Sequence, residues 1–343
     1  MLHHVNAHIH TPYSFSAFGS IDQALDAALA EDVKVVGIND FYSTEGYGSW
    51  MDGCARRGLY PLFGIEFIAL DAALRDAGLR VNDPGNPGRT YISGKGLCRP
   101  LPAGSKEARE LESLRAESNA QAERMCAKLN EYLRSEGIPV ELSFSEIKAT
   151  LTSGLVRERH LAKALRMKLH PDAENPAAEE NDLRSRLLKA GKPAFVPENP
   201  EAFLPVEDVQ RIIEAAGGIP TYPFLGDDAS GGFTDFEADL QKAADSLRSR
   251  GFRSAEFITT RNTTAVLERY AGFLEDEGFI VTFGSEHNTP AMEPLKLRTR
   301  DCPALSEKLQ EINWRGACAI AAHQAGLDSP AAGEELILKT LEG

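Results

Sequence analysis

Long apolar runs, closely spaced cysteines and basic residues are all scarce in this 343-residue chain. No stretch reaches the ~18 consecutive apolar residues of a membrane span, and the amino terminus lacks the basic segment and apolar run of a secretion signal. The five cysteines are widely spaced, without the Cys-x-x-Cys pair of a zinc knuckle or redox site. The sequence therefore predicts a cytoplasmic protein with reduced thiols and no membrane contact.

The shortage of basic residues limits the partners that this protein can bind. Lysine and arginine number 37 against 51 aspartates and glutamates, so the formal net charge is −14. Binding to nucleic-acid phosphates needs clustered lysines and arginines, and the charge argues against such a role. A small anionic substrate is compatible with the sequence if a few arginines converge locally.

Strand and helix patterns alternate in the first part of the chain, as they do in α/β proteins with parallel strands. Residues 5–9 and 33–38 are predicted strands, separated by an amphipathic helix over 21–31. A second helix over 44–57 and a strand within 59–70 follow. This alternation predicts a core of buried parallel strands covered by helices.

The pattern changes after residue 70. A loop rich in Gly and Pro at 82–89 precedes a long polar helical stretch over 105–136, and alternation resumes near residue 209. The chain is therefore expected to divide into the first part of the core over 1–70, an inserted and mainly helical cap over 71–190, the rest of the core over 191–302, and closing helices over 303–343.

Polar residues stand at the predicted carboxyl ends of strands, where parallel sheets and barrels bind their ligands. They are His8, His10, Asn39, Asp40, Glu66, Tyr222, Glu256, Arg261, Glu286 and His287. Because these strand ends meet at one edge of the core, the residues are expected to surround one site.

His8 and His10 are two residues apart in a strand, so both side chains point to the same face. Two imidazoles at this spacing can bind one metal ion, and a carboxylate from a neighbouring strand can complete the ligand set. A packed or exposed histidine pair has the same spacing. The further acids and histidines at other strand ends favour the metal site.

The same residues resemble the motifs of a known family, the PHP (polymerase and histidinol phosphatase) superfamily of metal-dependent phosphoesterases. Five segments carry the resemblance in the family's order, and together they span most of the chain apart from the insertion and the tail. They are His8-Ile9-His10-Thr11 with Ser14, Gly37-Ile38-Asn39-Asp40 with Glu45-Gly46, Gly64-Ile65-Glu66, Arg159-His160-Leu161-Ala162, and Gly284-Ser285-Glu286-His287.

The resemblance implies a distorted seven-stranded (β/α) barrel with up to three divalent ions, which share a hydroxide and split a phosphate ester. It implies that His8, His10, Glu66 and Glu286 bind the first ion, and that Glu66 bridges to a second ion bound by His160. A bridging carboxylate holds two cations close enough for a shared water to lose a proton near neutral pH.

Several ligand positions of the family hold other residues in this chain. The replacements are Asp40-Phe41 for Asp-His, Thr221-Tyr222-Pro223 for Ala-His-Pro, Glu286-His287-Asn288 for Asp-x-His, and Phe15 or Ser16 for a ligand after the first motif. The ligand set is therefore degenerate, and we expect one ion, or two at most. Histidine and carboxylate ligands suit zinc, manganese and iron alike.

Arg89, in a Gly-rich segment, and Arg261, after the strand with Glu256, are the candidates for binding an anionic substrate. A flexible loop and a surface position are the structural alternatives for these two arginines. His160 would serve equally well on a helix face without a ligand role.

Asp40, Tyr222 and His287 are candidates to protonate the leaving group or to fill vacant ligand positions. The sequence does not choose among them, and Asp40 could simply cap the helix that follows it.

The sequence thus predicts a metal-dependent phosphoesterase that acts on a small phosphorylated metabolite. One alternative is a hydrolase or lyase of a carboxylated sugar metabolite, since an ion with converging arginines also suits carboxylates. The other is a catalytically silent PHP-like domain that binds a small anionic metabolite. The oligomeric state, and whether the cap serves the active site or an interface, are open at this point.

Overall fold

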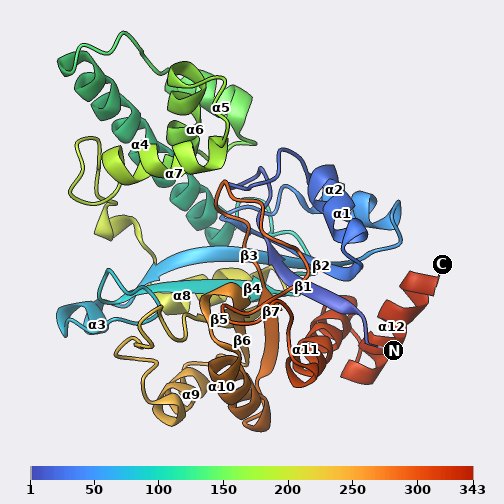
Figure 1. The fold of residues 1–343 in the computed structure, drawn as a ribbon. Coiled ribbons are helices and arrows are strands. Elements are labelled where there is room, and N and C mark those ends of the chain that lie inside the picture. Colours follow the sequence, from blue (N-terminus) through green and yellow to red (C-terminus); the bar gives the residue numbers. More distant parts are fainter. Residues whose placement is uncertain (1, 343) are drawn as a thin grey trace.

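The computed structural model describes residues 2–342 (Figure 1). Its seven strands form one sheet in chain order: β1 (His4–Ile9), β2 (Val33–Phe41), β3 (Tyr60–Leu70), β4 (Arg89–Lys95), β5 (Ile219–Phe224), β6 (Ser254–Ile258) and β7 (Ile280–Gly284). The helices of the barrel are α1 (Ile21–Ala30), α2 (Tyr47–Ala55), α3 (Ala72–Asp76), α8 (Val206–Ala215), α9 (Leu240–Ser249) and α10 (Thr264–Asp276), with short 3-10 turns η1 (Pro200–Ala202) and η2 (Thr259–Arg261).

The sheet is a nearly closed barrel, which confirms the predicted fold class. Strands β1 to β3 are mutually parallel, and so are β5 to β7. β4 runs antiparallel to both of its neighbours. The sequence pattern assigns residues 89–95 to the insertion, whereas the structure places them in the barrel. The segment follows a Gly/Pro loop and contains only Tyr91 and Ile92 as large apolar residues, so it lacks the apolar run expected of a buried strand.

The barrel closes between β1 and the residues after β7, through irregular pairing. His10 N donates to the carbonyl of Glu286 (2.7 Å), and Glu286 N donates to the carbonyl of His8 (3.0 Å). Gly284 permits this approach, because a Cβ atom at that position would lie 2.2 Å from the Cβ of His8. Closure therefore brings the His8–His10 motif next to the motif at Glu286.

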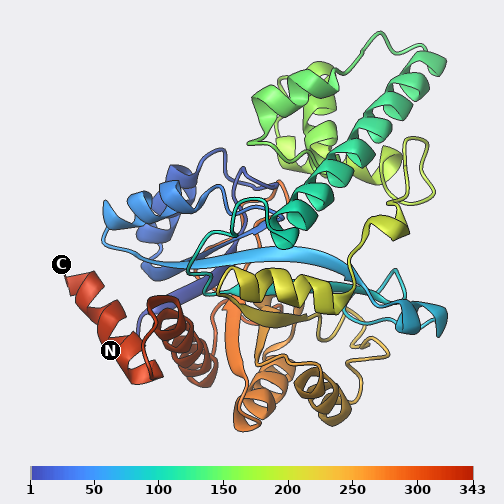
Figure 2. The same ribbon diagram turned by 180° about the vertical axis from the view of Figure 1, so that it is seen from behind.

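The cap consists of α4 (Lys106–Ser135), α5 (Phe144–Leu151), α6 (Glu158–Leu169) and α7 (Pro176–Leu187). Its helices share a hydrophobic core of their own, which includes Met125, Leu129, Leu161, Leu165 and Leu183. Figures 1 and 2 show the cap on one side of the barrel and α9 and α10 on the other. The cap is thus a separately packed layer, which contacts the barrel at the base of α4 and at the start of α6.

The closing helices are α11 (Glu307–Ala325) and α12 (Pro330–Glu342). Trp314, Ala317 and Ile320 of α11 pack against Val5 and Ala7 of β1, which ties the end of the chain to its beginning. Within residues 2–342, no helix has both the length and the apolar character needed to cross a membrane.

Candidate metal centre

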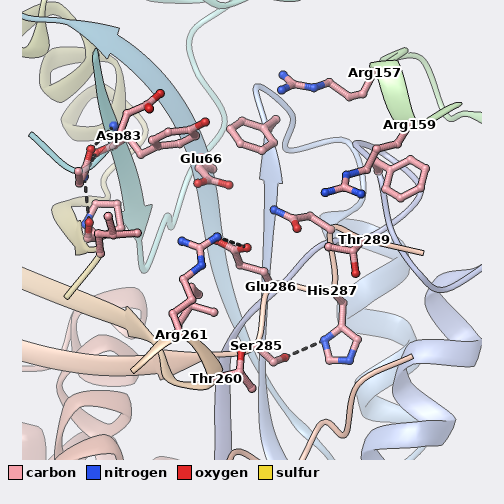
Figure 3. Close-up of a pocket in the computed structure, with 18 of the residues that line it drawn as sticks. Glu66, Asp83, Arg157, Arg159, Thr260, Arg261, Ser285, Glu286, His287 and Thr289 are labelled. Carbon is pink, nitrogen blue, oxygen red and sulfur yellow. Dashed lines mark hydrogen bonds and ion pairs between the residues drawn. The ribbon is translucent and has the colours of Figure 1, made fainter. Parts of the chain in front are cut away.

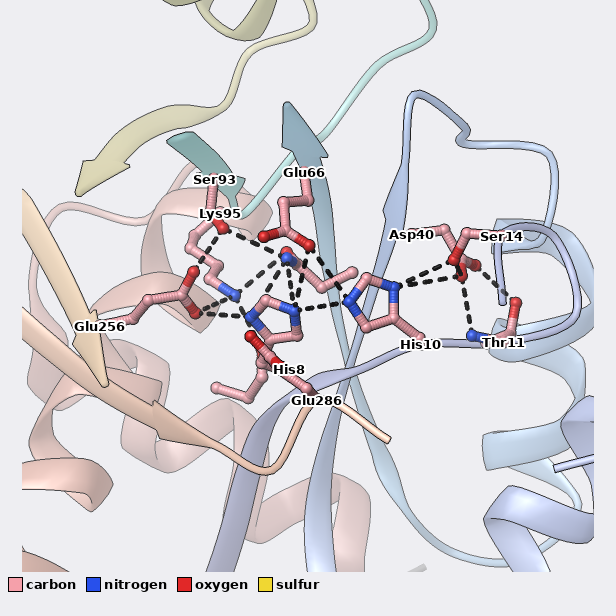
Figure 4. Close-up of polar contacts among 12 residues, drawn as sticks. His8, His10, Thr11, Ser14, Asp40, Glu66, Ser93, Lys95, Glu256 and Glu286 are labelled. Carbon is pink, nitrogen blue, oxygen red and sulfur yellow. Dashed lines mark hydrogen bonds and ion pairs between the residues drawn. The ribbon is translucent and has the colours of Figure 1, made fainter. Parts of the chain in front are cut away.

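His8 and His10 project from the end of β1 into the barrel, and both are buried (1% and 0% exposed). Their Nε2 atoms lie 3.2 Å apart. The Nδ1 atoms face opposite ways, that of His8 toward Glu256 and that of His10 toward Ser14 (Figure 4). Both rings therefore present Nε2 to the same point.

The hydrogen bonds around these rings assign their tautomers. His8 Nδ1 lies 3.0 Å from Glu256 Oε2, a carboxylate oxygen that can only accept from it. His10 Nδ1 lies 3.0 Å from Ser14 Oγ, whose own hydroxyl donates to Asp40 (2.6 Å). Each Nδ1 therefore carries the proton, and each Nε2 presents a lone pair, as in metal-binding histidines oriented by an outer carboxylate.

Glu66, on β3, supplies a third lone pair at the same point. Its Oε2 lies 3.1 Å from His10 Nε2 and 3.7 Å from His8 Nε2. This oxygen is buried, and no donor in residues 2–342 forms a hydrogen bond to it. Three converging lone pairs repel one another unless a metal ion or a proton lies between them.

The spacing of these atoms suits a transition-metal ion. A tetrahedral zinc ion with bonds of about 2.0–2.1 Å would separate its ligand atoms by about 3.3 Å, close to the distances found here. Within residues 2–342, His8, His10 and Glu66 are the one group of three His, Cys, Asp or Glu side chains near enough to hold an ion. We refer to these three residues as the metal cluster.

Asp40 lies behind the metal cluster. Its carboxylate accepts from Thr11 N (2.7 Å) and from the hydroxyls of Thr11 and Ser14. Burial raises the pKa of Asp40 despite these hydrogen bonds and the nearby His10. Burial lowers the pKa of His10, but Glu66, Asp40 and Glu286 outweigh burial, so that its pKa is raised. Asp40 thus orients His10 through Ser14 and does not face the open space between barrel and cap.

A second buried carboxylate supports His8. Glu256, on β6, accepts from His8 Nδ1 and from Lys95 Nζ (2.7 Å) with the same oxygen. Ser93 donates to its other oxygen, and Asn39 donates to Ser93 (3.2 Å). Burial raises the pKa of Glu256, but Lys95 and His8 outweigh it and hold the pKa well below its usual range. Glu256 is therefore a carboxylate that fixes His8.

Glu286 lies at the edge of the metal cluster. Its carboxylate pairs with Arg261 (2.7 Å), and its backbone has a φ of 63° in the closing turn. Burial raises the pKa of Glu286, whereas Arg261, His8 and His10 lower it more strongly. Arg261, predicted to bind substrate, thus stands beside a residue predicted to bind metal.

His287 follows in the same turn, and both of its ring nitrogens have partners. The carbonyl of Glu293 can only accept, so His287 Nε2 donates to it (2.7 Å). In the neutral ring Nδ1 then accepts from the hydroxyl of Ser285 (2.7 Å), whose oxygen also accepts from Asn6 (2.7 Å). The ring also stacks on Phe18, and its burial lowers the pKa of His287.

A cavity of about 540 Å³ opens between the barrel and the cap, above the metal cluster (Figure 3). Glu66, Glu286, Arg261 and His287 line it from the barrel. Arg157 and Arg159 line it from the start of α6, and Arg184 from α7. The volume suits a small metabolite.

The three cap arginines differ in how they are paired. Arg184 binds Glu158 (2.8 Å), and the guanidinium of Arg157 lies over the ring of Phe41 (4.8 Å). Arg159 donates a long hydrogen bond to Asn181 (3.4 Å), and no carboxylate in residues 2–342 forms an ion pair with it. Burial, and then the charge of Arg184, lower the pKa of Arg159 to about 10. The cap side of the cavity thus carries an excess of positive charge, although the chain is strongly acidic.

His160 and Tyr222 do not join the metal cluster. His160 Nδ1 accepts from Arg157 N (3.0 Å) at the start of α6, and the ring packs edge-on against Phe15. Its burial lowers the pKa of His160 to about 3. Tyr222 lies in the barrel core, where its hydroxyl donates to Glu237 (3.0 Å). Both positions are explained by packing and local hydrogen bonds.

Arg89 lies outside the lining of the cavity. It pairs with Asp83 (3.1 Å) and with Glu198, which follows the cap. These two carboxylates already satisfy its charge, so it joins the loop before β4 to the end of the cap.

Sequence reasoning does not identify Lys95, Arg157, Arg159 or Arg184 as site residues. Lys95 belongs to the strand that the sequence pattern assigns to the insertion. Arg159 belongs to a motif that carries the resemblance, but that motif implies a role for the neighbouring histidine. The unusual density of arginine in Arg157-Glu158-Arg159 is the available signal.

Comparison with known proteins supports the fold. A protein from Bifidobacterium adolescentis, provisionally assigned as a metal-dependent phosphoesterase, superposes with a TM-score of 0.60 at 17% identity, over 90% of this chain and 95% of its own. An amidohydrolase from Chromobacterium violaceum, solved with bound sulfate and no metal, has a TM-score of 0.60 at 18% identity, over 96% and 99% of the two chains. No family model and no curated protein sequence matches the chain.

Proposed function

We propose that this protein is a metal-dependent hydrolase that acts on a small phosphorylated metabolite. The observation that carries the proposal is the convergence of three lone pairs, from His8, His10 and Glu66, at the base of a cavity lined by arginines. The names of the two similar structures, a provisional metal-dependent phosphoesterase and an amidohydrolase, agree with metal-dependent hydrolysis.

The metal cluster would hold the ion, with Glu286 as an additional ligand if it exchanges Arg261 for the metal. When bound, such an ion lowers the pKa of water and polarises a phosphoryl oxygen. Glu256 and Asp40 hold the two histidines in the tautomer that binding requires.

The arginines favour an anionic substrate. Arg159 has no carboxylate partner among residues 2–342 and can donate two parallel hydrogen bonds to a phosphate or a carboxylate. Arg157 adds charge from the same wall, and Arg261 lines the cavity from the barrel beside Glu286.

Protonation of the leaving group is assigned to His287 within the same proposal. Among the three candidates, His287 alone lines the cavity, since Asp40 lies behind His10 and Tyr222 lies in the core. To act as a proton donor, its Nε2–H must leave the carbonyl of Glu293 and turn toward the substrate.

Metal content is the decisive measurement. Untagged protein prepared without chelator should contain about one transition-metal ion per chain by inductively coupled plasma mass spectrometry. The His10→Ala/Glu66→Ala variant should contain almost none, whereas His323→Ala/Glu335→Ala, an exposed pair on the closing helices, should match the wild type. Absence of metal from all three after loading with zinc, manganese and iron would contradict the proposal.

Substrate class is tested with the loaded protein. Hydrolysis of phosphate monoesters, with loss of turnover in the Glu66 variant, is the expected result. If the protein turns over lactones or carboxylated sugars but no phosphate ester, it is instead the hydrolase or lyase of a carboxylated sugar metabolite. Binding of sugar phosphates without any turnover would identify a silent binding domain.

A further inference from the structure

Lys95 is a buried cation that the proposed reaction does not use. It lies at the end of β4 with 3% of its surface exposed. Its ammonium group contacts three oxygens: Glu256 Oε2 at 2.7 Å, Asn39 Oδ1 at 3.0 Å and the carbonyl of Ala7 at 3.0 Å. All three N–H donors of the ammonium group are thereby matched, which is the environment that a buried charge requires.

One carboxylate oxygen separates this ammonium group from the metal cluster. Glu256 Oε2 accepts from Lys95 on one side and from His8 Nδ1, at 3.0 Å, on the other. Figure 4 shows Lys95 and Glu256 on one side of His8, opposite His10. A second divalent ion, bound next to the ion of the metal cluster, would place its positive charge at the position that the ammonium group of Lys95 already occupies.

We propose that Lys95 takes the place of a second divalent ion, so that the centre binds one ion. The inference rests on the proposed function, because the ion is the one held by His8, His10 and Glu66. Besides Glu66, the buried carboxylate in contact with His8 is that of Glu256. Lys95 pairs with this carboxylate and so prevents Glu256 from binding a second metal ion.

The balance of charge agrees with a single ion. Glu66, Glu256 and Glu286 bring three negative charges, and Lys95 and Arg261 neutralise two of them. For these five side chains, one divalent ion then leaves a sum of one positive charge, and Asp40, buried behind His10, lies beside them as a further carboxylate. A second ion would add two more positive charges in a buried site, where like charges repel strongly.

The three oxygens around Lys95 also predict the effect of removing its charge. Glu256 Oε2, Asn39 Oδ1 and the carbonyl of Ala7 are hard ligands of the kind that Mn²⁺ accepts. In Lys95→Met, which keeps an unbranched side chain one atom shorter and removes its charge, these oxygens lose their cation. A Mn²⁺ ion is expected to enter in its place.

The experiment is a calorimetric titration with Mn²⁺, supported by electron paramagnetic resonance. The wild type should bind one Mn²⁺ per chain and show the spectrum of an isolated ion. Lys95→Met should bind two and show magnetic coupling between them. Lys242→Met, which removes an exposed lysine on α9, should bind one.

A second variant keeps the proposal testable if Lys95→Met does not fold. Lys95→Gln also removes the buried positive charge but keeps an N–H donor for the carbonyl of Ala7, so it should fold and bind two ions. Two ions in the wild type, or one ion in folded Lys95→Met or folded Lys95→Gln, would overturn the role of Lys95 and leave the proposed function standing. A wild type that binds no Mn²⁺, zinc or iron would instead contradict the proposed function.

Discussion

The barrel and the cap face the same cavity with opposite chemistry. The barrel floor, defined as Glu66 and Glu286 with His8 and His10 buried beside them, offers lone pairs and negative charge. The cap wall, defined as Arg157, Arg159 and Arg184, offers guanidinium groups. An ion on the floor and arginines on the wall can hold one anion between them. Each part alone therefore supplies half of the proposed site.

The two parts also differ in how firmly they are built. Strand pairing and barrel closure position the floor, and every histidine there is held by a carboxylate or hydroxyl behind it. The wall belongs to helices with a separate hydrophobic core. Contacts such as Ser153 N to the carbonyl of Pro12 (3.0 Å) join it to the barrel. The floor is thus fixed by the sheet, and the wall by the packing of the cap.

Glu66→Gln should produce the largest effect, because it removes charge from the floor alone. Metal content is expected to fall from about one ion per chain to near zero, since a neutral amide is a poor third ligand for two histidines. Folding should be retained, because Gln has the same size. A variant that keeps its metal would show that Glu66 is not a ligand.

Arg159→Met is the matching change on the wall. The affinity of the loaded protein for inorganic phosphate should fall about 10- to 100-fold, as expected for loss of a charged hydrogen-bond donor worth about 1.5–3 kcal/mol. Metal content should be unchanged. Lys168→Met, an exposed position on the same helix, is the control, and calorimetry measures all three proteins. Equal phosphate affinity in Arg159→Met and wild type would remove the wall from the proposal.

Acid should lower the free energy of unfolding through His160, which lies in the cap beside the arginines of the wall. The pKa of His160 is about 3 in the folded protein, because of burial, and about 6.5 in an unfolded chain. The unfolded state therefore binds more protons between these values, and the stability present above pH 6.5 is lost as pH falls toward 3. At pH 5 the loss amounts to about 2 kcal/mol.

Denaturant unfolding at pH 7.5 and pH 5, followed in the wild type and in His160→Gln, measures this loss. The variant cannot bind the proton, so its stability should change less between the two pH values. An equal loss in both proteins would assign the pH dependence to other groups.

Arg89→Met should have the smallest effect on binding. Arg89 is held by Asp83 and Glu198 and does not line the cavity, so phosphate affinity should stay within about twofold of the wild type. A loss of tenfold or more would restore Arg89 as a substrate-binding residue and would extend the wall beyond the three cap arginines.

The sequence predicted the parts of the site that depend on the repeat of side-chain directions within one strand or helix. His8 and His10 share a face because side chains alternate along a strand. Glu66 was expected at a strand end, whereas β3 continues past it to Leu70. The helical character of the cap and the closing helices were equally predictable from their patterns. These features depend on neighbours within a few residues.

Which distant residues meet depends on the tertiary structure instead. Antiparallel pairing of β4 turns Lys95 toward Glu256, 161 residues later in the chain. Packing of α6 on Phe15 and Phe41 places His160 away from the metal cluster and Arg159 at the cavity. The alternation of side chains along a strand determines which face of the sheet a side chain lies on. Which distant residue that side chain contacts depends on strand direction, on barrel closure and on how the cap packs against the barrel, and local sequence does not encode these.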